Sequence, residues 1–94
     1  MSERTAASLA KFDELYPVLK SLDPGPAHQR LIDDAEALRR AIASFHMEAI
    51  RFRMHNVDRA LREAGDHAAA RAAFEALRQA LEAAGFHTRS QAAP

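Results

Sequence analysis

The 94-residue sequence contains no cysteine, no tryptophan, one tyrosine and only three glycines. Without cysteine, a disulfide framework, a thiolate nucleophile and a cysteine-ligated zinc site are all excluded. No run rich in Val, Ile, Thr and Tyr alternates as a β-strand would. The first twelve residues lack the apolar core of a signal peptide, and no apolar run reaches membrane-spanning length. We therefore expect a cytoplasmic protein with no membrane segment.

Apolar residues make up 48% of the chain, and many of them are alanine. Burial of apolar surface stabilises a fold by about 25 cal/mol per Å², and alanine buries little surface per residue. We therefore expect a small free energy of unfolding, which self-association would increase. The length allows a single hydrophobic core. We predict one all-α domain over residues 1–85, followed by a flexible tail over residues 86–94.

The charges balance overall but are unevenly distributed along the chain. Residues 1–38 carry four Lys and Arg against seven Asp and Glu, a net charge of −3. Residues 39–94 carry nine against six, a net charge of +3. Complementary halves of this kind favour head-to-tail or antiparallel association.

Proline and glycine mark the ends of the expected helices. Asp23-Pro24-Gly25-Pro26 stops one helix and begins the next, and Gly65 suits the left-handed position that follows a helix. Pro17 removes a backbone donor inside the first helix, so we expect a kink or a break beside it. The short turn at Gly65 makes the last two helices an antiparallel hairpin. The predicted helices cover about residues 3–22, 26–64 and 66–84.

Two apolar stripes run along the long central helix, each stepping by four and then three residues. The first contains Leu31, Ala35, Leu38, Ile42, Phe45, Ala49 and Phe52, and the second, rotated around the helix, contains Ile50, Met54, Val57, Leu61 and Ala64. A continuous helix leaves one flank of each stripe for a second chain to cover. This interpretation predicts a three-helix antiparallel bundle with a long central helix, completed by homodimerisation. A break near Ser44–Met47 predicts instead a four-helix monomer that closes on itself.

Three polar side chains, His46, Arg53 and Asn56, lie on or between these stripes. A buried arginine needs an anion, because a lone buried charge is very costly. Asp13, Glu14, the C-terminal carboxylate or an anionic ligand would each serve Arg53. These three residues are our candidate ligand or partner junction. The alternative interpretation is a polar layer that sets helix register, or an Arg53 that extends outward to solvent.

The face opposite the stripes carries our candidate partner-facing residues, Met47, Arg51, His55 and Arg62. A basic face can follow phosphates in nucleic-acid-binding proteins. Neutral overall charge, the position of Asp58 within the face and the absence of interleaved aromatics argue against nucleic acid. A solvated helix face with a few ion pairs is the simpler interpretation.

The five histidines do not have the spacing of a metal site. Helical ligands pair three or four residues apart, and no two histidines are so placed. The serines lie in no nucleophile-elbow context, and there is no glycine-rich phosphate loop. We expect no metal, no other cofactor and no enzymatic activity; the alternatives are a metal held by one histidine of each copy across a dimer interface, and an active site built between subunits.

Residues 56–77 resemble a tetratricopeptide hairpin in part. The resemblance is carried by Asn56-Val57-Asp58-Arg59-Ala60-Leu61, then Gly65-Asp66-His67, then Ala70 and Phe74. Asp58 replaces the small residue of that family, and His67 replaces its usual aromatic. The family also stacks several repeats, and only one candidate is present here. We interpret the similarity as that of a general helical hairpin.

Three hypotheses about function follow. The first is a small helical protein–protein interaction module that acts as a homodimer and serves as an adaptor, assembly factor or accessory subunit. The second is a sensor of a small ligand or anion, built around Arg53 and tuned by His46. The third is a nucleic-acid-binding helical regulator, which has the least support.

Overall fold

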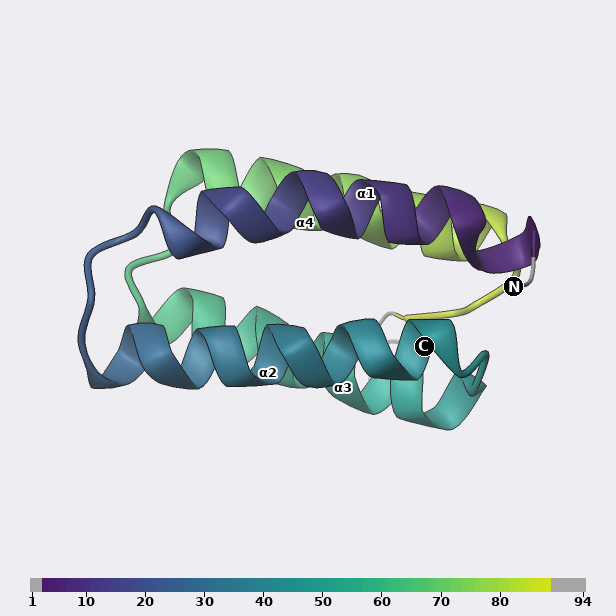
Figure 1. The fold of residues 1–94 in the computed structure, drawn as a ribbon, viewed down its shortest axis with the longest axis horizontal. Coiled ribbons are helices and arrows are strands. Elements are labelled where there is room, and N and C mark those ends of the chain that lie inside the picture. Colours follow the sequence, from purple (N-terminus) through teal and green to yellow (C-terminus); the bar gives the residue numbers. More distant parts are fainter. Residues whose placement is uncertain (1–2, 89–94) are drawn as a thin grey trace, which may run out of the picture.

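Four helices, each antiparallel to the next, form a bundle in the computed structural model (Figure 1). The structure describes residues 3–88, with side chains from Thr5 onward. The helices are α1 (Glu3–Lys20), α2 (Pro26–Ala43), α3 (Met47–Glu63) and α4 (Ala68–Ala83). α1 and α4 form one layer, and α2 and α3 form the other. Residues 3–88 contain no β-strand, so the all-α prediction is confirmed, and none of these helices has the length and apolar character to cross a bilayer.

The long central helix predicted over residues 26–64 is wrong. The chain leaves helical geometry at residues 44–46, so α2 and α3 are separate helices that fold back on each other. The observed break is the one that the alternative prediction placed near Ser44–Met47. The four helices enclose one core within a single chain, so a second chain is not needed to complete it.

The end of α2 lacks the residue that usually signals a helix end. Phe45 adopts a left-handed φ of 61°. Its N–H donates to the carbonyl of Ile42 at 3.1 Å, and the N–H of His46 donates to the carbonyl of Ala41 at 3.4 Å. This is a Schellman ending, which glycine usually provides and does provide at Gly65 after α3. With phenylalanine in the left-handed position, the sequence carries no glycine signal for the turn.

The break also accounts for the two stripes. The first stripe is buried only as far as α2 extends, at Leu31, Ala35, Leu38 and Ile42. The second stripe is the buried face of α3, at Ile50, Met54, Val57 and Leu61. Phe52 continues the first stripe by spacing alone, lies on the outer face of α3, and is 57% exposed. The change of stripe therefore marks a change of helix.

The two flanks of α4 differ in side-chain size. The backbones of α1 and α4 lie close together, whereas those of α3 and α4 approach at few positions. On the helical wheel the flank toward α1 is made of alanines, of which Ala73 and Ala84 pack against the core. The flank toward α3 carries Arg71 and Arg78, whose long side chains fill the wider gap.

The predicted ends of the chain need two corrections. α1 continues through Pro17 without a break and ends at Lys20, before the predicted residue 22. Phe86 and Thr88, at the start of the predicted flexible tail, are buried. The rest of that tail, residues 89–94, lies outside the described residues.

Candidate functional site

A groove of about 390 Å³ opens between α1 and α2. It is lined by Phe12, Asp13, Tyr16, Glu36, Arg39, Arg40 and Ala43. The rings of Phe12 and Tyr16 stack one turn apart on α1, with centroids 5.8 Å apart and planes inclined by 22°. Phe12 is almost completely buried, so it forms the base of the groove. A hollow of this size with an aromatic base suits one apolar side chain or small ligand.

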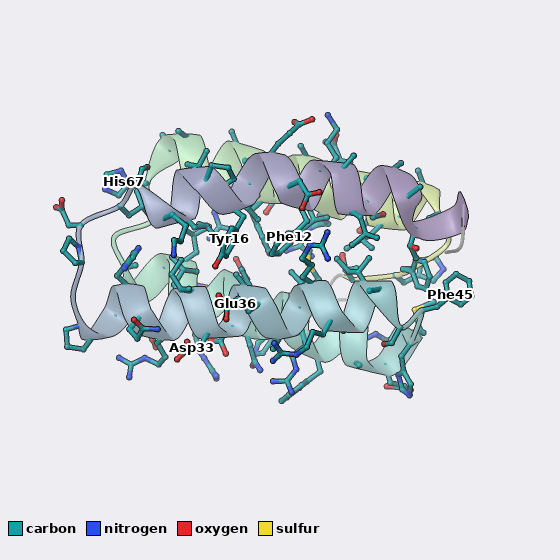
Figure 2. All side chains as sticks on the ribbon, in the orientation of Figure 1. Phe12, Tyr16, Asp33, Glu36, Phe45 and His67 are labelled. Atoms are coloured by element: carbon teal, nitrogen blue, oxygen red, sulfur yellow. The ribbon has the colours of Figure 1, made fainter. Side chains whose placement is uncertain are left out.

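A hydrogen bond crosses the groove from α1 to α2. The Tyr16 hydroxyl donates to Oε2 of Glu36 at 2.6 Å, and Figure 2 shows the two side chains extending toward each other. This bond raises the pKa of Tyr16, and burial and the negative charge of Glu36 act in the same direction. The phenol therefore stays protonated at neutral pH and acts as a fixed donor.

The charged groups at the groove are unequally satisfied. Arg39 pairs with Asp13 through Nε and Oδ1 at 3.4 Å. Glu36 is engaged by Tyr16. Arg40 is exposed and has no ion pair or hydrogen bond to any side chain that the structure describes. At the groove, two carboxylates thus each have one oxygen engaged, and one guanidinium has no partner among the described side chains, an arrangement suited to binding.

The three residues of the predicted junction are not brought together. His46 is the N-cap of α3, and its Nδ1 accepts a hydrogen bond from the Ala49 N–H at 3.1 Å. Asn56 is nearly buried, and its Oδ1 accepts a long 3.5 Å hydrogen bond from Arg59. Arg53 is only partly buried. Each residue has a separate partner, and among the described residues no hydrogen bond or ion pair joins any two of the three.

Arg53 lies over an aromatic ring rather than beside an anion. Its guanidinium carbon is 5.2 Å from the centroid of the Phe52 ring. The carboxylates proposed for it are paired elsewhere, Asp13 with Arg39 at 3.4 Å and Glu14 with Lys11 at 3.6 Å. The C-terminal carboxylate is outside the described residues. Among the side chains that the structure describes, Arg53 has no carboxylate partner.

The candidate partner-facing residues lie in different environments. Met47 packs against the core, and Arg51 donates through Nε to the carbonyl of His87 at 3.3 Å. Arg62 donates to Asp58 at 2.7 Å. Only His55, which is exposed, has no such contact among the described residues. They therefore do not form one continuous free surface.

Among the side chains that the structure describes, two large apolar ones are exposed, Phe45 at 40% and Phe52 at 57%. The Phe45 ring makes an edge-to-face contact with Phe86, at a centroid distance of 5.3 Å. Phe52 contacts only the guanidinium of Arg53 among the ring contacts described. Phe52 has the spacing of the buried stripe only if α2 and α3 are taken as one continuous helix.

A network of charged side chains joins α3 to α4, and it is absent from the residues predicted as a site. Arg71 bonds to Asp58 at 2.6 Å and to Glu75 at 3.2 Å. Glu75 also pairs with Arg78 at 3.1 Å, and both guanidiniums lie over the ring of Phe74. The available signal was the placement of two arginines three residues before and four residues after one buried aromatic.

Burial and charge compete within this network. Burial raises the pKa of Asp58, but hydrogen bonds and charges from Arg71 and Arg62 outweigh it and hold that pKa below its ordinary range. Burial lowers the pKa of Arg71, but its hydrogen bonds to Asp58 and Asp66 and their negative charges outweigh burial, so the pKa is raised overall. Both shifts favour the ionised forms, so the network keeps its charges in the folded chain.

In the part of the chain that the structure describes, no three His, Asp or Glu side chains gather where a metal ion could bind. No protein family matches the chain, and no curated protein or solved structure shows significant similarity to it. The function is therefore inferred from the residues themselves.

Proposed function

We propose that the chain is a small cytoplasmic protein–protein interaction module that acts as a homo-oligomer, in the role of an adaptor, assembly factor or accessory subunit. The observation that carries this proposal is Phe52, which stays 57% exposed on the outside of a bundle whose core is already closed. Arg53 lies against its ring. Aromatic residues and arginine are enriched at protein interfaces and dominate their binding energy.

The distribution of charge favours a second copy as the partner. The acidic first half of the chain, with a net charge of −3, complements the basic second half, with +3. Arg53 belongs to the basic half and has no carboxylate partner among the described side chains. A carboxylate from the acidic half of another copy would supply one.

Sedimentation velocity over a wide concentration series tests the proposal. The native chain should show a concentration-dependent increase in mass. Phe52→Ser should weaken that association at least tenfold, about 1.4 kcal/mol in free energy, without lowering the melting temperature, because the ring is exposed. His55→Ala, a substitution at another exposed position of α3, is the control and should associate normally. A native chain that stays monomeric at every concentration would overturn the proposal.

The two other hypotheses have less support. A joint anion site is disfavoured because His46 caps α3 while Arg53 lies against Phe52. Nucleic-acid binding is disfavoured because Arg51 and Arg62 of the basic face already bond to groups of the chain itself. Phosphate contacts would have to compete with these bonds.

A further inference from the structure

We propose that Phe52 of one copy inserts into the groove between α1 and α2 of another, so that the copies associate head to tail. The inference rests on the proposed self-association and specifies its geometry. The groove is lined only by residues of α1 and α2, and Phe52 projects from the outer face of α3. The two surfaces therefore belong to different faces of one molecule and can meet only between molecules.

The shape and chemistry of the groove fit an aromatic side chain. Its volume of about 390 Å³ exceeds what one ring needs and is open to solvent, so a ring enters without moving either helix. Its base is the stacked pair of Phe12 and Tyr16. A third ring would stack against this pair or meet it edge to face, and either arrangement attracts more than the buried area alone predicts.

The charges beside the ring and around the groove also match. Arg53 follows Phe52, and Glu48 lies one turn before it on the same helix. Neither has an ion pair with a described side chain. At the groove, Asp13 and Glu36 each have one oxygen engaged and one without a described partner, and Arg40 is unpaired. Arg53 can therefore meet an acidic group of the groove while Glu48 meets Arg40.

The geometry has a consequence for assembly. A head-to-tail contact uses the ring of one copy and the groove of the next, so each complex retains one unused ring and one unused groove. Such contacts continue as an open filament of copies or close into a cyclic oligomer. A symmetric dimer, in which Phe52 of one copy contacts Phe52 of the other, would stop at two.

Two variants, each lacking one half of the contact, test this geometry. Phe52→Ser removes the ring and leaves the groove. Ala43→Arg places a long polar side chain in the groove and adds a positive charge that repels Arg53; Ala43 is exposed, so folding should be retained. Ala72→Arg, at an exposed alanine of α4, is the matched control and should associate like the native chain.

Each variant alone should associate at least tenfold more weakly than the native chain. Their equimolar mixture should form a complex of one copy of each, and nothing larger, in sedimentation velocity and native mass spectrometry. Two impaired variants that form no complex on mixing would overturn the head-to-tail geometry and leave the proposed self-association standing. Native-like association of Ala43→Arg would overturn it as well. A monomeric native chain would overturn both proposals.

Tyr16 provides a second readout that needs no groove variant. It is the only tyrosine, and the chain has no tryptophan, so the emission of the protein comes from the groove. Emission per molecule should change as the native chain is diluted, and it should stay constant for Phe52→Ser. Association without any change in Tyr16 emission would contradict insertion into the groove.

Discussion

The guanidinium of Arg78 donates through one nitrogen to two oxygens of Thr88, the carbonyl at 3.0 Å and the hydroxyl at 3.1 Å. Both residues are buried. Arg78 thus fastens the segment after α4 to the side of the bundle, and Arg51 adds a bond to the carbonyl of His87.

Arg78→Ala should lower the free energy of unfolding by about 2–3 kcal/mol, because hydrogen bonds to a buried charge are lost and the carbonyl and hydroxyl of Thr88 are left without their donor. Urea unfolding measures this loss. Arg62→Ala is the control, since Arg62 makes an ion pair with its side chain 55% exposed, and its loss should cost about 0.5 kcal/mol. Equal effects of the two variants would contradict a special role for Arg78.

His46→Ala should destabilise the chain by about 1 kcal/mol, because α3 loses its N-cap acceptor. His46→Asp should retain most of that stability, since a carboxylate both accepts the bond and interacts favourably with the start of the helix. Thermal unfolding of the two variants gives the comparison. If Asp were as damaging as Ala, capping would not be the role of His46.

The pKa of Tyr16 can be measured directly by its ultraviolet absorbance, because it is the only tyrosine. The hydrogen bond to Glu36 raises that pKa, so the midpoint of the titration should lie above the value of about 10 found in unfolded chains. The bond contributes its full stabilisation below the unfolded pKa of about 10, and this stabilisation is lost as pH rises through the folded pKa.

Glu36→Gln should lower the titration midpoint of Tyr16 relative to the native chain, because the charge of Glu36 is removed. Asp33→Asn, an exposed change on the same helix, should leave the midpoint unchanged. Circular dichroism at each pH checks that the protein is folded. A midpoint unaffected by Glu36→Gln would mean that the bond does not persist in solution.

Asp58→Asn should destabilise the chain by about 1–2 kcal/mol at pH 7, because Arg71 and Arg62 lose a charged acceptor. The pKa of Asp58 is lowered in the folded protein, so its contribution is present above the unfolded value of about 3.9 and is lost as pH falls through the folded value. Urea unfolding of both proteins at several pH values should show the difference shrinking in acid. A difference that is independent of pH would exclude the ionised carboxylate as its source.

Helix type and most helix ends could be predicted from the sequence, because apolar spacing and the glycine and proline positions are local signals. The end of α2 could not, because Phe45 occupies a position where glycine is the usual signal. The prediction of one continuous helix over residues 26–64 therefore placed Arg53 and Phe52 on its buried face, whereas α3 is a separate helix on which Phe52 is exposed.

The candidate site depends on distances that no single helix determines. Tyr16 and Glu36 are 20 residues apart, and their bond requires a particular rotation of α1 against α2. Arg71 and Asp58 are 13 residues apart across a turn. Their chemistry was visible in the sequence, but their proximity follows from how whole helices pack.

The close packing of α1 against α4 has a consequence during synthesis. α1 is synthesised before α4, against which it packs in the finished bundle, and until α4 has emerged one flank of the buried face of α1 has nothing to cover it. Leu15 and Leu19 lie on that face and are completely buried only in the folded chain. The bundle therefore cannot close on the ribosome until α4 has emerged, and a nascent chain stopped before α4 should be a substrate for chaperones.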